Sequence, residues 1–301
     1  MTGPTPIFVL GIQRSGTTFA ANLLAAHPQI AAVTAERHQG VHESVFFSHF
    51  ARVHGDWSDA FARRKAVAGF LTSDYFRLTG LDPALPGIAK PEDEAGFFRA
   101  VMDAFAASHD AQAWVEKSPH HTLLVDKIAA ALPDARFLCV TRETADFLAS
   151  RLWSYGRTPP PYPQRAATIS RACTSNVFHS RFLADFVARL GPSRAFLVEY
   201  AALQSDADAA LTPLLNACGL MPQNGQRPAF RPNSSFSASR EREAALTRTD
   251  RLIAWISTHA AKSVPLWILS RLQARQSARR PQDFPKWVWT LPPEPTLPNE
   301  G

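Results

Sequence analysis

The segment that most constrains the fold is residues 11–18, GIQRSGTT, which follows the apolar run 7–10 and precedes an Ala- and Leu-rich stretch. A buried strand, a glycine-containing loop and a helix N-terminus form an anion site, because backbone N–H groups and the helix dipole point at the ligand. Gly11 and Gly16 have the spacing of a Walker loop, but Thr17 stands where that loop has lysine, and Arg14 lies inside it. The sequence therefore predicts a phosphate-binding loop without the lysine that contacts the β- and γ-phosphates of a nucleoside triphosphate.

Composition narrows the class of protein only moderately. A chain of 301 residues with a net charge of +6 suits an anionic ligand or partner. The three cysteines are odd in number and have no metal-ligand spacing, so we expect reduced thiols in a reducing compartment. No apolar run approaches a membrane span, and no basic segment precedes the first apolar run. We therefore expect a soluble, cytoplasmic protein.

Short apolar runs alternate with segments of helical periodicity along most of the chain. This alternation predicts βαβ units and an α/β fold, with a central parallel β-sheet between helices in a three-layer α/β/α arrangement and with variable helical insertions. The expected strands are 6–11, 30–33, 113–115, 136–141 and 195–199. The expected helices are 16–27, 41–76, 92–108, 119–132, 143–153, 166–190, 206–218 and 241–259, with loops at 79–92 and 222–240 and an irregular tail from 281.

Polar residues follow directly after several of the expected strands. Ligands of parallel α/β sheets bind at the carboxyl ends of the strands. Five unrelated surface residues would rarely all fall at such positions, so we expect them to share a site: Arg14, Glu36, Lys117, Arg142 and Tyr200.

Four local patterns occur together: "GIQRSGTTF", "EKSPHH", "PDARFLCVTRETADFLASRL" and "FLVEYAAL". Together they resemble the sulfotransferases that use 3′-phosphoadenosine 5′-phosphosulfate (PAPS), and are most similar to the branch with an RSGTT loop, which includes tyrosylprotein and many bacterial sulfotransferases. The resemblance covers residues 6–220. It implies one sulfotransferase domain over 1–301, with a helical insertion at 41–111 that shapes the acceptor site and C-terminal loops and helices at 222–301.

The resemblance also implies a set of donor-binding residues. The product of transfer would be 3′,5′-ADP, and no metal is required. The 3′-phosphate would lie on Arg142 and Ser150, and Tyr200 would lie near the nucleotide. Taken alone, a surface ion pair for Arg142 and a helix-face position for Ser150 would be favoured, but the spacing of the two residues reverses this; core packing explains Tyr200 equally well. The loop residues implied for the 5′-phosphosulfate are Arg14, Ser15, Gly16, Thr17 and Thr18, and those implied for covering the nucleotide are Asn233 and Ser234.

Sulfuryl transfer needs a cation near the leaving oxygen and a base for the acceptor hydroxyl. The resemblance implies Lys117 as the cation, with Arg14 second; the alternative is that Lys117 pairs with Glu116. For the base it implies Glu36 first and a histidine of the Lys motif, His120, second.

Two other function classes remain open at the level of sequence. One is a P-loop kinase for a small metabolite, which would need a lysine equivalent and Mg²⁺ carboxylates. The other is a non-catalytic module that binds a phosphonucleotide or nucleic acid, although we expect no nucleic-acid partner. The acceptor (lipid, polyketide, peptide or sugar hydroxyl, or an amine) and a possible homodimer also stay open. The aromatic residues of 41–111 suit either helix cores or an apolar acceptor pocket.

Overall fold

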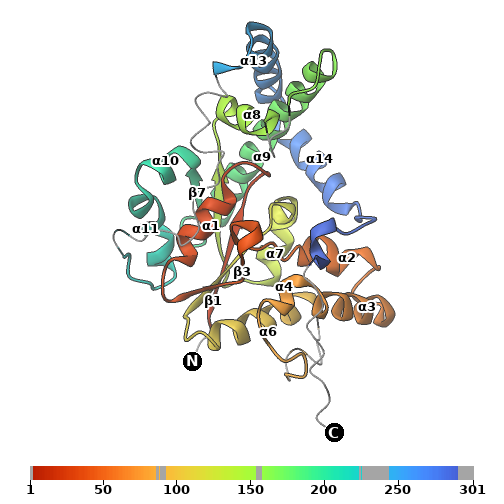
Figure 1. Ribbon diagram of the computed structural model, residues 1–301, viewed down its shortest axis with the longest axis vertical. Helices are drawn as coiled ribbons and strands as arrows, with labels where there is room; N and C mark the ends of the chain where they lie inside the picture. Colours follow the sequence, from red (N-terminus) through yellow and green to blue (C-terminus); the bar gives the residue numbers. More distant parts are fainter. Residues whose placement is uncertain are drawn as a thin grey trace.

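The computed structural model describes residues 3–85, 88, 93–153, 158–223, 225 and 244–290. Its centre is a five-stranded parallel sheet in the order β2-β5-β1-β6-β7 (Figure 1). The strands are β1 (Thr5–Leu10), β2 (Ile30–Ala32), β5 (Ala113–Lys117), β6 (Arg136–Thr141) and β7 (Ala195–Glu199). The predicted α/β fold with a central parallel sheet is confirmed.

Both faces of the sheet are buried under helices. Ile7 and Val9 belong to one apolar cluster and Phe8 and Leu10 to another, as expected from the two-residue period of a strand. The first cluster includes residues of α1 (Thr17–Ala25) and α11 (Ala207–Ala217), and the second includes residues of α6 (Glu94–Ala107), α7 (Val125–Ala131) and α9 (Gln164–Leu190). The result is the predicted three-layer arrangement.

The remaining elements connect these layers or extend them. A small antiparallel hairpin, β3 with β4, follows β2, and α13 and α14 pack against α9 (Figure 1). Their bounds are β3 (Thr34–Ala35), η1 (Glu36–His38), β4 (Gly40–Val41), η2 (Phe46–Phe50), α2 (Ala51–Val53), α3 (Ala60–Leu71), α4 (Asp74–Arg77), η3 (Pro119–Leu124), α8 (Thr144–Leu152), α10 (Tyr200–Ser205), α13 (Arg248–Lys262), α14 (Leu266–Ala278) and η5 (Lys286–Trp289).

Within the described part of the chain, no single helix has both the length and the apolar character needed to span a membrane. The pair α13 and α14, bent by 98°, meets that criterion together by length and composition only.

The expected helix over 41–76 is wrong. The chain there contains β4, a single π-helical turn η2 and the separate helices α2, α3 and α4. The breaks have local causes: Gly55 has a φ of 134°, the Asp59 side chain caps α3 by accepting from two backbone N–H groups, and Ser73 caps α4. Capping side chains and a positive-φ glycine therefore outweigh the aromatic periodicity of this segment.

The aromatic residues of this segment form core. Phe46 and Phe70 are fully buried, and the Phe46 ring stacks on Phe98 with centroids 5.1 Å apart. Phe284 of the C-terminal segment adds to the same cluster, 4.7 Å from the ring of Phe50. Of the eight aromatic side chains between 46 and 76, only Phe61 is exposed. The core interpretation is therefore confirmed for most of these residues.

Candidate active site

The register of the sheet brings four predicted positions to one edge. Val9 pairs with Lys117, Leu10 with Cys139, and Thr141 with Glu199. The strands are parallel and end together, so Lys117, the loop after Leu10, Arg142 and Tyr200 all lie at the carboxyl edge of the sheet.

The loop between β1 and α1 has an unusual backbone. Arg14 has a φ of 79° and Gly16 a φ of 103°, and Gly16 is the N-cap of α1. A Cβ atom on Gly16 would lie 2.2 Å from Cδ2 of Tyr200, so only glycine fits against this ring. The loop therefore exposes the first turn of α1 beside the face of an aromatic side chain.

Arg142 links this loop to α8. Its Nε and Nη2 donate to both carboxylate oxygens of Asp146, at 2.6 and 2.7 Å, and its Nη1 donates to the Arg14 carbonyl at 3.0 Å. The guanidinium lies 4.4 Å from the centre of the Tyr200 ring. Arg14 in turn donates from Nε to the Ser150 hydroxyl at 3.2 Å. The two arginines, the serine and the tyrosine are thus held as one group.

These residues enclose a cavity of about 90 Å³. Seven residues expected to bind the donor line it, and no carboxylate does within the described part of the chain. Three further lining residues, Phe19, Asn22 and Gln39, are absent from the sequence prediction. The predicted residues that line the cavity are Arg14, Gly16, Thr17, Thr18, Arg142, Ser150 and Tyr200.

The other donor-binding predictions fall elsewhere. Ser15 is fully buried and does not line the cavity, and its backbone N–H donates to the Ile12 carbonyl at 2.9 Å. Asn233 and Ser234 lie outside the described residues. The Ser15 side chain is therefore buried within the loop and does not belong to the cavity lining.

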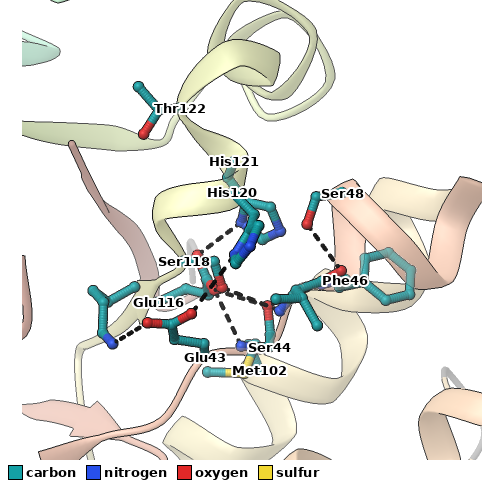
Figure 2. A network of polar contacts seen from close by, with 12 residues as sticks. Glu43, Ser44, Phe46, Ser48, Met102, Glu116, Ser118, His120, His121 and Thr122 are labelled. Carbon is teal, nitrogen blue, oxygen red and sulfur yellow. Dashed lines mark hydrogen bonds and ion pairs between the residues drawn. The ribbon is translucent and has the colours of Figure 1, made fainter. Parts of the chain in front are cut away.

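A second group of polar side chains lies at the end of β5 (Figure 2). The Lys117 ammonium is almost fully buried and pairs with Glu43 at 2.8 Å, where the sequence suggested Glu116 as the alternative partner. The other Glu43 oxygen lies 3.7 Å from Nδ1 of His120. Burial by itself would raise the pKa of Glu43, but the Lys117 charge and the contact with His120 outweigh it and lower the pKa to about 2. Glu43 is therefore an ionised link between a lysine and a histidine, and no sequence pattern predicted it.

Glu116 forms a separate buried network just beneath. Its Oε1 accepts from the Ser44 hydroxyl at 2.7 Å and from the Ser118 hydroxyl, and its Oε2 lies 3.0 Å from Nδ1 of His121. Glu116 and His121 are both fully buried, and Figure 2 shows them with Ser44 and Ser118 beside Glu43 and His120. Burial alone would raise the pKa of Glu116, but the imidazole of His121 and the hydroxyl hydrogen bonds reverse this and lower it. This network fixes the segment that carries Glu43.

His120 borders a larger cavity, of about 690 Å³, on the other side of the loop. Ile12 and Gln13 line this cavity too, whereas Arg14 and Gly16 line the smaller one. Glu36 lies in η1 between β3 and β4, is exposed and lines neither cavity. The structure thus places His120 at the edge of the larger cavity, and Glu43 connects it to Lys117. Glu36 does not lie at this cavity.

No cluster of three or more His, Cys, Asp or Glu side chains arranged to hold a metal ion is present within the described ranges.

Replacing Gly16 with alanine should destabilise the protein by about 1–3 kcal/mol, because the residue must keep a positive φ and its Cβ would overlap the Tyr200 ring. Gly191→Ala is the matched control, since Gly191 has a φ of 86° and an added Cβ there would have no atom within 4 Å. Urea unfolding of both variants measures the difference. An equal loss of unfolding free energy in Gly16→Ala and Gly191→Ala would show that the contact with Tyr200 does not restrict residue 16.

The Glu43 ion pair should make stability depend on acid pH. Because the folded pKa is about 2 and the ordinary value 4.5, the pair's contribution is complete above pH 4.5 and is lost as pH falls toward 2. The difference in free energy of unfolding between the wild type and Glu43→Gln should therefore shrink below pH 4.5, by at most about 1.4 kcal/mol per pH unit. Urea unfolding at pH 7, 5, 4 and 3.5 tests this, and a constant difference across the series would contradict the low pKa.

Comparison with known proteins identifies the family. A family model described as "Sulfotransferase family" matches residues 6–223. No curated protein matches the chain.

Among solved structures, the chain is similar to the sulfotransferase domain of the olefin synthase of Synechococcus, at 16% identity and a TM-score of 0.51, with 95% of this chain and 98% of that chain covered. It is also similar to a sulfotransferase from Alicyclobacillus acidocaldarius, at 14% identity and a TM-score of 0.48, with 86% and 97% covered. At such identities the first likeness supports the fold alone. The family model covers well over half of the sequence and coincides with the sheet and its loop, so the chain belongs to the sulfotransferase family.

Proposed function

We propose that this sulfotransferase moves a sulfuryl group from PAPS to a hydroxyl or amine of an acceptor. The observation that carries the proposal is the small cavity, which gathers the residues of both implied phosphate sites around one tyrosine ring. Arg142 and Ser150 form one side and the first turn of α1 the other, with Arg14 between them. The cavity, of about 90 Å³, is lined by the guanidinium groups of Arg14 and Arg142, the latter paired with Asp146, and such groups suit phosphate oxygens.

The residues in this cavity fit the donor's chemistry. The planar fork of Arg142 suits a phosphate, and the exposed amides of the first turn of α1 suit an anion. Phe19 and Tyr200, with ring centroids 5.9 Å apart, offer aromatic surface for the adenine. The donor, when bound, supplies the sulfuryl group, and this chain's residues hold its two anionic ends.

We assign the acceptor side to the larger cavity and the base to His120. A carboxylate with a pKa of about 2, such as Glu43, is a weak base at neutral pH, whereas imidazole ordinarily titrates near neutrality. Glu43 lies on the Nδ1 side of His120 and orients the ring, and Lys117 keeps Glu43 ionised. Glu36, the base implied by resemblance, is exposed on η1 and remains the competing candidate.

The two cavities border the same loop, and in-line transfer needs the acceptor oxygen to meet the sulfuryl group there. Gln13 borders the acceptor side and Arg14 the donor side. Lys117, at the end of the neighbouring strand β5, pairs with Glu43 and lines neither cavity, whereas Arg14 lines the smaller one. We therefore assign Arg14 as the cation that stabilises the leaving oxygen and Lys117 as the residue that holds Glu43. We further propose that the chain is a cytoplasmic enzyme with one domain.

Donor binding can be tested without an acceptor. At a hundredfold excess over its Kd, 3′,5′-ADP should stabilise the wild type by about 2.7 kcal/mol and raise the Tm, whereas ATP with Mg²⁺ should do so far less. Arg142→Lys should lose most of this shift, because lysine keeps the charge but loses the planar fork. Selective stabilisation by ATP and Mg²⁺ would favour the kinase alternative. Binding of 3′,5′-ADP without transfer to any acceptor would favour a non-catalytic module.

Three matched variants identify the base. His120→Asn should lower kcat about 10²- to 10⁴-fold with labelled PAPS and an active acceptor, while the 3′,5′-ADP affinity stays unchanged. Glu43→Gln should lower kcat less, because it removes the carboxylate charge beside His120 and Lys117 but keeps both of those side chains. Glu36→Gln should stay close to the wild type. Loss of turnover in Glu36→Gln together with an active His120→Asn would instead establish Glu36 as the base.

A further inference from the structure

The cavity beside His120 continues into a second one. The second cavity, of about 310 Å³, lies between α9 and α14, and the two share lining from Leu123, Arg171, Ser175 and His179. Gln273 of α14 donates to the Leu123 carbonyl at 2.7 Å, which fixes α14 against η3 at this junction. Together the cavities form one groove of a size that suits a ligand with an extended body.

The end of the groove nearest His120 is positively charged. Arg151 of α8 and Arg171 of α9 line it, and no Asp or Glu lines either cavity within the described ranges. Neither arginine forms an ion pair with a described carboxylate, although Arg171 donates from Nε to the Ala167 carbonyl at 3.3 Å. Burial lowers the pKa of His179, so this histidine adds no charge at neutral pH. Two guanidinium groups that face no described carboxylate favour an anionic ligand group.

The far end of the groove has apolar walls, with polar residues such as Thr174, Gln273 and Gln276 beside them. Phe178 and Phe182 of α9 face Leu269 and Leu272 of α14 across the second cavity. Leu269 and Phe182 are buried, whereas Leu272 is 38% exposed at the rim. Such walls gain free energy by covering hydrocarbon, at about 25 cal/mol per Å² of apolar surface removed from water.

We propose that the acceptor is an anionic amphiphile. Its polar head carries both the hydroxyl, which lies by His120, and a carboxylate or phosphate, which lies on Arg151 and Arg171. Its hydrocarbon chain lies between α9 and α14. The assignment of the hydroxyl rests on the proposed function, whereas the anionic and apolar subsites rest on the groove itself.

Two pairs of probes test the proposal by calorimetry at concentrations below micelle formation, with and without 3′,5′-ADP. The first pair is 3-hydroxydodecanoate and 1,3-dodecanediol, and the second is lauroyl-lysophosphatidylglycerol and monolauroylglycerol. Within each pair the hydrocarbon length is matched and only one member is anionic. The anionic member of at least one pair should bind at least about tenfold more tightly, and the responding pair distinguishes carboxylate from phosphate.

Variants locate the two subsites. Arg171→Ala should remove most of the preference for the anionic member, and Leu272→Asp should weaken the binding of all four probes. Arg275→Ala is the control, because Arg275 is exposed on α14 and does not line the groove. All three variants should bind 3′,5′-ADP like the wild type.

Equal binding of anionic and neutral members in both pairs would overturn the proposal, as would an anion preference that survives Arg171→Ala. Failure of the donor assignment gives a different result. In that case 3′,5′-ADP does not bind to the wild type, while the amphiphiles still bind in its absence with the predicted dependence on Arg171 and Leu272.

Discussion

The site depends on the buried carboxylate of Glu116. A fully buried charge is costly unless hydrogen bonds satisfy it, and here they come from two segments outside its own strand. Ser44 approaches from the chain after β4, and His121 from η3. Ser118 completes the set and also accepts from the backbone N–H of Val45 at 3.1 Å. Because these partners are adjacent in sequence to Glu43, Lys117 and His120, satisfying Glu116 also places the catalytic candidates.

A second constraint ties the donor loop to the same centre. The Thr122 hydroxyl of η3 accepts from the Gly11 N–H and donates to the Gly11 carbonyl, both at 3.0 Å. On its other side the loop is held by Arg142 and Ser150 of the β6–α8 segment. The loop is therefore held from both sides, and it borders both cavities. The same holds for α8, where Ser150 lines the smaller cavity and Arg151 the larger one.

Local sequence patterns predict the sheet and seven of the residues that line the small cavity, but not Phe19, Asn22 or Gln39. Strands 136–141 and 195–199 have the predicted bounds, because continuous apolar runs between polar turns are distinctive. Arg14, Arg142 and Tyr200 follow from strand ends, which the parallel register brings together, whereas Ser150 is implied by the resemblance alone.

The polar residues near the larger cavity are harder to predict from the sequence. Glu43 lies in a segment whose aromatic spacing mimics a helix, and its partner Lys117 is 74 residues away, so no local pattern marks the pair. The resemblance implies Glu36 as the base, from its distance to the loop along the sequence. In the structure Glu36 lies in the β3–β4 hairpin and is exposed. The lysine motif itself is a usable signal, since it includes His120, which lines the larger cavity.

The most direct test of the central claim is a crystal structure of the protein with 3′,5′-ADP. We predict that the 3′-phosphate contacts Arg142 and Ser150, and that the 5′-phosphate contacts the backbone amides of Gly16, Thr17 and Thr18. We also predict that the larger cavity beside His120 stays free of the nucleotide. A nucleotide bound in that larger cavity, or phosphates that avoid Arg142, would contradict the assignment of the two sides.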